Sequence, residues 1–152
     1  MKRFHYSLET VLNYKTQVLD GLKKEHAVIL KSVNDKKEEI RQLNGRLMDY
    51  EDSFNETKSS GASIETYRLY DMCIGRMEER IEQEEERLVA LKTKEEKKKN
   101  EVIDAKVDTS KFEKLKDKRL KEYRAAEQKE EEAFVEEFVI RTMGNEAPIY
   151  RG

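Results

Sequence analysis

Apolar residues recur along the first third of the chain in alternating steps of four and three. This spacing is typical of the narrow seam of a coiled coil, because it keeps one side chain in every half heptad facing the partner helix. All but four of the positions on this walk are apolar, and the exceptions are two histidines and two lysines. The positions are His5, Leu8, Leu12, Lys15, Leu19, Leu22, His26, Ile29, Val33, Lys36, Ile40, Leu43, Leu47, Tyr50 and Phe54.

A run of small and polar residues, 55–63, breaks this pattern and predicts a bend. The same walk then resumes, clearly as far as Leu91 and more weakly beyond it. Its positions are Tyr67, Tyr70, Ile74, Met77, Ile81, Glu84, Leu88, Leu91, Glu95, Lys98, Val102, Ala105, Thr109 and Phe112.

Capping residues set the expected boundaries of a single domain, 1–152. Ser7 is a plausible N-cap for the first helix, and Gly144-Asn145 followed by Pro148 predicts the end of the second. We expect a first helix at about 7–57, a turn at about 58–63, a second helix at about 64–143 and a C-terminal tail at 144–152.

Two long amphipathic helices joined by a short bend bury their seams most simply against each other. The sequence therefore predicts an all-α fold, a long antiparallel two-helix coiled-coil hairpin with a longer second helix. In such a hairpin the residue numbers of facing seam positions add to about 120 to 124, which sets Lys36 against Glu84 and His26 near Glu95 and Lys98. We expect these polar seam residues to set the register of the two helices.

Charged residues make up 42% of the chain and the mean hydropathy is -0.97, which argues against a compact globular core. The 31 basic and 33 acidic residues nearly balance, so nucleic acid is not the expected partner. Residues 1–6 lack the apolar run of a signal peptide, and no stretch is apolar enough to span a bilayer. A single cysteine, Cys73, suits a reducing compartment, so we expect a soluble, cytoplasmic protein.

The histidines and the cysteine allow a chemical and a structural interpretation. His5 and His26 both fall on the seam without a second metal ligand nearby, which favours packing over a ligand or pH-switch role. Cys73 stands beside Tyr70 and Ile74, which favours a small interface side chain over a reactive thiol.

The charge runs also have a simple interpretation as solvated helix faces. Consecutive glutamates at 84–86 and 130–132 point in different directions on a helix, so they do not converge on an ion. Lysines 97–99 lack interleaved aromatic residues and have acidic neighbours, which disfavours binding to nucleic acid or lipid. The sequence contains no glycine-rich phosphate loop and no catalytic motif, so we expect no enzymatic activity, no cofactor and no metal.

Aromatic residues gather on both sides of the bend. Tyr50, Phe54, Tyr67 and Tyr70 could all serve only to close the end of the hairpin core. However, so many rings at the end of two helices are hard to bury completely, and tyrosine is favoured at protein interfaces. The tip is therefore a candidate for both core and binding surface.

Several stretches, in their order and spacing, resemble the FliJ family of flagellar export proteins over nearly the whole chain. They are Phe4-His5-Tyr6-Ser7-Leu8-Glu9-Thr10-Val11-Leu12, Gln42-Leu43-Asn44-Gly45-Arg46-Leu47-Met48-Asp49-Tyr50, Tyr70-Asp71-Met72-Cys73-Ile74 with Met77 and Ile81-Glu82-Gln83, and Phe112-Glu113-Lys114-Leu115-Lys116-Asp117-Lys118-Arg119 with the acidic stretch through Glu137.

The resemblance implies a non-enzymatic component of the flagellar type III export apparatus. Its paired terminal ends would sit in the central hole of the hexameric export ATPase and promote its activity, like the stalk of a rotary ATPase. Its hairpin tip would reach the cytoplasmic domain of the export gate, and the family is also associated with the recycling of export chaperones. Such a protein would lie at the cytoplasmic face of the inner membrane at the flagellar base, peripheral to the membrane through its partners only.

By position, the resemblance carries two residue sets onto this chain. The gate-binding set is Leu47, Tyr50, Phe54, Tyr70 and Met77, and the chain departs from the family pattern at Cys73, Arg80 and Glu84. The set expected near the ATPase is Arg3, Phe4, Tyr6, Leu8, Lys118, Arg119 and Arg124.

An alternative from a different class is a structural coiled coil that dimerises by itself, as a scaffold or spacer. Sedimentation distinguishes the two, because a hairpin stalk is an elongated monomer and a scaffold is a stable dimer.

Overall fold

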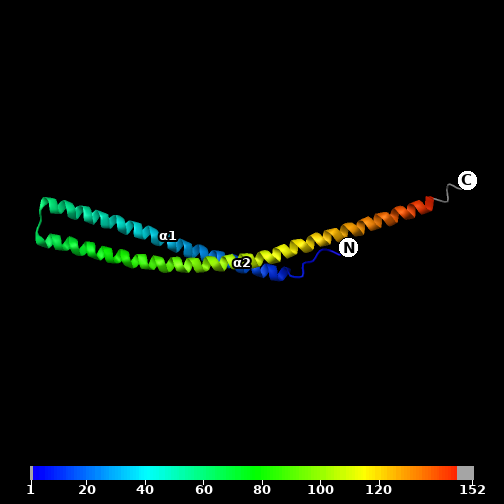
Figure 1. Cartoon of the computed structure of the whole chain (residues 1–152), viewed down its shortest axis with the longest axis horizontal. Helices are drawn as coiled ribbons and strands as arrows, with labels where there is room; N and C mark the ends of the chain where they lie inside the picture. Colours follow the sequence, from blue (N-terminus) through cyan, green and yellow to red (C-terminus); the bar gives the residue numbers. More distant parts are fainter. Residues whose placement is uncertain (1, 147–152) are drawn as a thin grey trace. The chain divides into compact units, whose positions relative to one another are not determined.

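The computed structural model describes residues 2–146, which form two helices and no strand. Helix α1 runs from Glu9 to Ser60 and helix α2 from Ile64 to Glu146. The helices are antiparallel neighbours joined by a short turn (Figure 1). The predicted all-α hairpin with a longer second helix is therefore confirmed.

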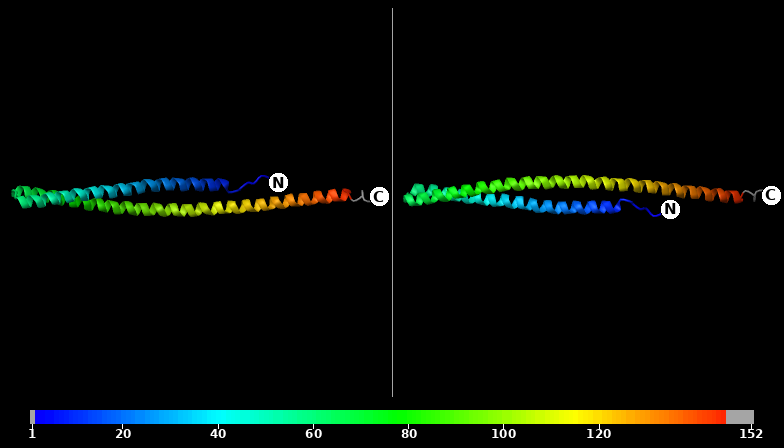
Figure 2. Two further views of the ribbon diagram at one scale, coloured as in Figure 1. Left: turned by 90° about the horizontal axis from the view of Figure 1, so that it is seen from above. Right: turned by 90° about the horizontal axis from the view of Figure 1, so that it is seen from below.

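The chain divides into two units, and each helix contributes to both. The first, which we call the tip unit, comprises residues 19–104 and contains the turn. The second, which we call the terminal unit, combines residues 2–18 with α2 from residue 105 onward. Within the tip unit α1 and α2 lie side by side in every view (Figures 1 and 2).

The turn consists of three residues whose backbone groups are satisfied locally. Gly61 has a φ of 83°, a left-handed conformation that favours glycine, and its amide donates to the carbonyl of Thr57 at 2.9 Å. Ser63 caps α2, because its hydroxyl accepts from the amide of Thr66 at 3.3 Å. The Tyr67 hydroxyl accepts from the amide of Ala62 at 3.0 Å and so ties the turn to the first turn of α2.

The core of the tip unit is the predicted seam. Its buried apolar side chains are Leu19, Ile29, Val33, Ile40, Leu43 and Ile81. Most other positions on the two walks within this unit are half-buried, although Tyr50 is exposed and Glu84 is buried, and the remaining helix faces are largely exposed and charged. The heptad walk therefore identifies the buried face of both helices.

The first residues of the chain do not follow the walk. Residues 2–6 are not helical, so the heptad spacing does not predict which of their side chains are buried. The expectation that His5 packs on the seam is wrong: His5 is exposed, and Tyr6 is buried in its place. Ser7 does not cap α1 either, because α1 begins at Glu9 and the Ser7 hydroxyl accepts from Arg119 at 2.9 Å.

At its other end α2 continues through Gly144 and Asn145 to Glu146. Glycine and asparagine lower helix stability without removing a backbone donor, so they do not by themselves stop a helix. Residues 147–152 of the predicted C-terminal tail, with Pro148, lie outside the described residues. Over residues 2–146, neither helix holds a segment with the length and hydropathy that crossing a membrane requires.

A polar layer interrupts the apolar seam in the middle of the tip unit. The Lys36 ammonium donates to Glu84 at 2.6 Å across the two helices and to Glu39 at 2.9 Å on its own helix. Glu84 is only 4% exposed and is also paired with Arg87 at 2.6 Å. A buried carboxylate without these partners would be costly, so we expect the layer to penalise any shift of one helix against the other.

A second polar layer lies farther from the turn. His26 Nε2 is 2.8 Å from a Glu95 carboxylate oxygen, and Lys98 pairs with Glu25 at 2.9 Å. Lys98 also pairs with Glu101 at 2.8 Å on its own helix. The structure thus brings together both predicted pairs of polar seam residues, while their role in setting the register stays a prediction.

The seam makes a prediction about core packing. Leu43 is 2% exposed, so Leu43→Ala should leave a cavity and lower the free energy of unfolding by about 2 to 4 kcal/mol. Met48 lies on the same helix and is 63% exposed, so Met48→Ala should change it by less than about 0.5 kcal/mol. Urea unfolding followed by circular dichroism measures both, and equal effects of the two substitutions would contradict the assignment of the seam.

The first polar layer predicts a dependence of stability on pH. The hydrogen bond from Lys36 lowers the pKa of Glu84 below its ordinary value of 4.5. A carboxylate with a lowered folded-state pKa stabilises the fold above its unfolded pKa of about 4.3, and this contribution is lost as the pH falls through the folded pKa. The hydrogen bonds to Glu84 and Glu39 raise the pKa of Lys36 above 10.5, so its contribution is present at neutral pH and lost only in strong alkali.

Glu84→Gln should therefore destabilise the hairpin at pH 7, and the difference from the wild type should shrink in strong acid, at a pH below the lowered pKa of Glu84. Glu85→Gln is a matched control, because Glu85 is exposed. Urea unfolding at the two pH values measures the effect. A difference from the wild type that persists unchanged in acid would mean that the charge of Glu84 does not carry the effect.

Candidate functional site

The tip unit carries a cluster of aromatic rings next to the turn. Phe54 on α1 stacks on Tyr70 of α2, with ring centroids 5.3 Å apart, and meets the edge of Tyr67 at 6.2 Å. The Lys58 ammonium lies 3.9 Å from the centroid of the Phe54 ring, a cation–π contact. These contacts fasten the ends of the two helices to each other.

A small apolar notch lies beside this cluster. It is lined by Tyr50, Leu69, Tyr70 and Cys73 and has a volume of about 120 Å³. Tyr50 and Leu69 are 41% and 56% exposed, so the notch opens to solvent and is large enough for one or two methyl groups of a partner.

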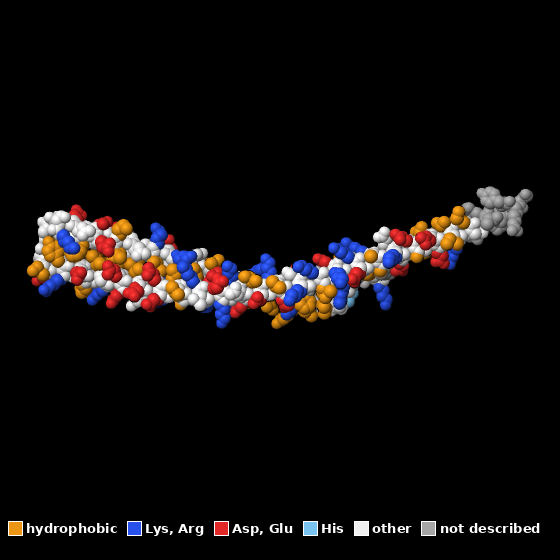
Figure 3. Space-filling view, in the orientation of Figure 1, with side chains coloured by type: hydrophobic (Ala, Val, Ile, Leu, Met, Phe, Trp, Pro, Cys, Tyr) orange, Lys and Arg blue, Asp and Glu red, His pale blue; other side chains and the backbone are white. Residues whose placement is uncertain are grey.

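The predicted gate-binding residues therefore occupy different positions at the tip. Phe54 and Tyr70 are joined in the aromatic cluster, Tyr50 lines the notch, and Leu47 and Met77 are half-buried on the seam. Their role in binding the gate stays a prediction. Hydrophobic side chains lie along this part of the hairpin between charged ones (Figure 3).

Leu69 and Met72 were missed by the sequence analysis, although both expose about half of their surface. They stand off the heptad walk, at a spacing of three residues that places them on one helix face. An apolar pair outside the seam in a chain rich in charge was the signal that could have found them.

The terminal unit ties the first residues of the chain to α2. The Tyr6 hydroxyl donates to the carbonyl of Phe112 at 3.0 Å, and the Tyr6 side chain is 3% exposed. The Tyr123 hydroxyl donates to the carbonyl of Lys2 at 2.5 Å, and its ring lies 5.5 Å from that of Phe4. These contacts hold the non-helical start of the chain along one face of α2.

Charged contacts reinforce the same pairing. Lys116 pairs with Glu9 at 2.9 Å, and Lys15 pairs with Asp108 at 2.6 Å. Arg119 donates to the Ser7 hydroxyl, and its guanidinium lies 5.8 Å from the centroid of the Tyr6 ring. Arg119 thus touches the N-terminal segment while remaining exposed.

The residues predicted to lie near the ATPase separate into two groups. Phe4, Tyr6 and Leu8 are buried or half-buried and serve the pairing of the N-terminal segment with α2. Arg3, Lys118, Arg119 and Arg124 are exposed basic residues of the terminal unit. Tyr123 and Lys116, which hold the segment in place, were missed, and the aromatic side chain at position 123 was the only sequence signal for them.

Within residues 2–146, no group of three or more histidine, cysteine, aspartate and glutamate side chains is arranged to hold a metal ion. Every buried side-chain nitrogen or oxygen there has a hydrogen-bond partner. Two surfaces of the described chain stand out: the aromatic residues at the tip, and the exposed basic side chains near Arg119 in the terminal unit.

Comparison with known families supports the same view of the molecule. The model of the family described as flagellar FliJ protein matches residues 4–147, almost the whole chain. Comparisons with curated proteins and with solved structures found no match. The family match spans both helices and confirms the resemblance found in the sequence: this chain belongs to the FliJ family, and it is a component of the flagellar export apparatus.

Proposed function

We propose that the protein is a non-enzymatic stalk of the flagellar export apparatus, with one partner at each unit. The terminal unit binds the hexameric export ATPase and promotes its activity, and the tip unit binds the cytoplasmic domain of the export gate. The protein then acts at the cytoplasmic face of the inner membrane, at the flagellar base, and reaches the membrane only through its partners. Escort of export chaperones is a further role in keeping with the family.

The observation that carries the proposal is the way in which the terminal unit is built. The contacts of Tyr6 and Tyr123 bring the start of the chain onto α2, so basic residues from two distant parts of the sequence share one unit. Arg3 comes from the N-terminal segment, and Lys118 and Arg124 come from α2. Exposed charges of this kind make weak contacts that solvent and salt screen. Such contacts with the polar lumen of the ATPase ring would allow the stalk to turn within the ring or to dissociate and be replaced.

The tip unit supports the second partner by a different chemistry. The ring of Phe54 is held between Tyr67, Tyr70 and Lys58, so the end of the hairpin presents a rigid apolar surface. Rigid aromatic side chains around a small open notch are suitable anchors for a protein partner, because little conformational entropy is lost on binding.

The ATPase proposal predicts that adding this protein to the purified export ATPase of the same organism raises its rate of ATP hydrolysis. Lys118→Glu combined with Arg124→Glu should raise the half-maximal concentration about tenfold, because two attractive charges become repulsive. The matched control reverses Lys94 and Lys97, exposed lysines of the same helix in the tip unit, and should behave as the wild type. Absence of stimulation at saturating protein would contradict the proposal.

The gate proposal predicts a loss of binding from the tip alone. Tyr50→Ser removes one wall of the notch and should weaken binding to the purified cytoplasmic domain of the gate about tenfold, without changing ATPase stimulation. Tyr14→Ser, at an exposed tyrosine of the terminal unit, is the control and should leave gate binding unchanged. Titration calorimetry measures the affinity of both variants for the gate domain. Equal losses of affinity in the two variants would show that the notch does not bind the gate.

A further inference from the structure

The last part of α2 displays an apolar face that the hairpin seam does not use. The N-terminal segment is held on α2 by the contact between Lys2 and Tyr123. Farther along the helix, Phe134, Phe138 and Met143 are 69%, 63% and 67% exposed. Large apolar side chains at such exposure, gathered in one segment, mark an interaction surface.

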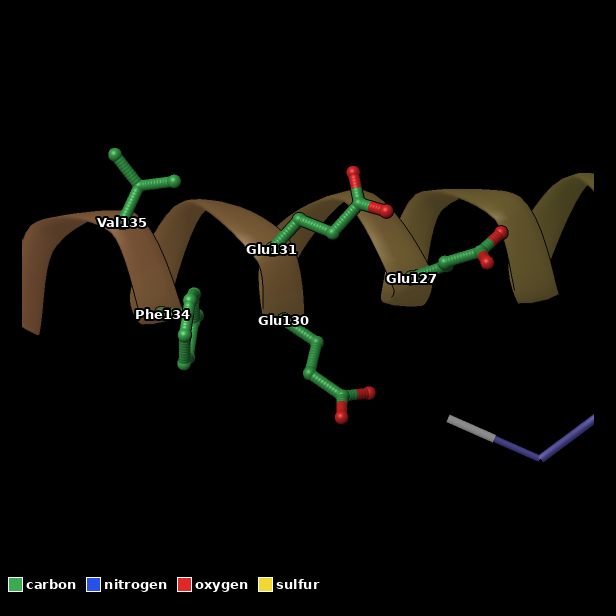
Figure 4. A pocket seen from close by; sticks show the side chains of 5 residues that line it. All are labelled: Glu127, Glu130, Glu131, Phe134 and Val135. Carbon is green, nitrogen blue, oxygen red and sulfur yellow. The ribbon is translucent and has the colours of Figure 1, made fainter. Parts of the chain in front are cut away.

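These side chains recur at the spacing of a helix turn. Phe134 and Phe138 stand four residues apart, as do Val135 and Val139, so each pair lies about one turn apart and the two pairs form neighbouring rows on the helix. Figure 4 shows the beginning of these rows: Phe134 projects to the same side of α2 as Glu130, and Val135 projects to the opposite side in this view, with Glu131. In Figure 3, hydrophobic and acidic side chains alternate on the same stretch of α2.

The charge around the face is strongly acidic. Residues 127–137 contain six glutamates and one lysine. Glu131, Glu132 and Glu136 line the hollows that border Val135. A partner that covers the apolar side chains must therefore bring positive charge to its own edges, because like charges facing each other across an interface repel.

We propose that residues 127–143 are a docking surface for an amphipathic helix of another protein, whose apolar stripe is flanked by lysine and arginine. The apolar stripe of the partner would pack on Phe134 and Phe138. The two helices would lie along each other, with contacts every three or four residues. This inference does not depend on the ATPase or the gate, because it concerns a different segment of α2 and a different chemistry.

A second copy of this chain fits the face poorly. Two such segments packed on each other would set acidic edges against acidic edges. The basic part of α2, 111–124, has the complementary charge, but among the described residues no large apolar side chain is exposed between 108 and 133 to receive Phe134. A membrane surface fits poorly as well, because anionic lipids repel the glutamates.

The test uses the full chain and two synthetic helical peptides as long as residues 127–146. Both peptides carry leucines at steps of three and four, and their flanks carry lysine in one and glutamate in the other. Fluorescence anisotropy of the labelled peptides should show binding of the lysine peptide only, weakening as salt rises. Phe134→Ser combined with Phe138→Ser should weaken this binding about tenfold or more.

Two further variants keep the result interpretable. Val28→Ser with Val89→Ser removes apolar side chains of similar exposure from the tip unit and should bind as the wild type. Glu131→Gln with Glu132→Gln and Glu136→Gln keeps the apolar face and should abolish the discrimination between the two peptides. Circular dichroism confirms that each variant remains helical.

Three results would overturn the proposal. The first is failure of the lysine peptide to bind, or equal binding of both peptides. The second is sedimentation of the wild type as a dimer that the double phenylalanine substitution dissolves, which would make a second copy the occupant. The third is cosedimentation with phosphatidylglycerol vesicles that depends on the same two phenylalanines, which would make a lipid surface the occupant. None of these results bears on stimulation of the ATPase.

Discussion

The structure depends on one constraint: a chain in which 42% of the residues are charged has apolar side chains for only a single stripe on each helix. A stripe so narrow cannot form a globular core. An unpaired helix would leave its apolar stripe exposed to water. Antiparallel pairing within one chain solves this, because each stripe covers the other. Buried residues such as Val33, Leu43 and Ile81 lie on this seam.

A purely apolar seam has many acceptable registers, since a shift by one heptad again pairs apolar with apolar. We expect the layer built on Lys36–Glu84 to remove this freedom, because a shifted helix would bury the Glu84 carboxylate without its partner. The His26–Glu95 pair adds a second polar contact between the helices. The left-handed Gly61 and the cap at Ser63 select a tight turn that agrees with the same register. Turn and polar layers therefore act together, and this agreement is what a single, well-defined hairpin requires.

The seam also explains where the binding surfaces lie. In the middle of the tip unit the seam residues serve the packing of the two helices, and exposed apolar side chains such as Val28 and Val89 stand singly among charged ones. Beside the turn the aromatic residues exceed what two helices can bury, and Tyr50 remains partly exposed. In the terminal unit the segment that packs on α2 is not helical, so its contacts come from individual side chains such as Tyr6 and Phe4. The FliJ family match gives these surfaces their setting in flagellar export.

The sequence by itself determined the class of fold, the buried face of each helix, the place of the turn and the family, because heptad spacing and breaker residues act locally and a seam repeats over many turns. It also identified Lys36 opposite Glu84, since in an antiparallel pair one register relates every facing position. Only the tertiary structure decided what happens where that periodicity ends. The exposure of His5, the burial of Tyr6, the Ser7–Arg119 contact and the bond from Tyr67 to the turn depend on contacts between segments that no local pattern encodes. The exposure of Leu69 and Phe134 was also decided only by the tertiary structure, because an apolar side chain is covered only where another segment of the chain packs against it.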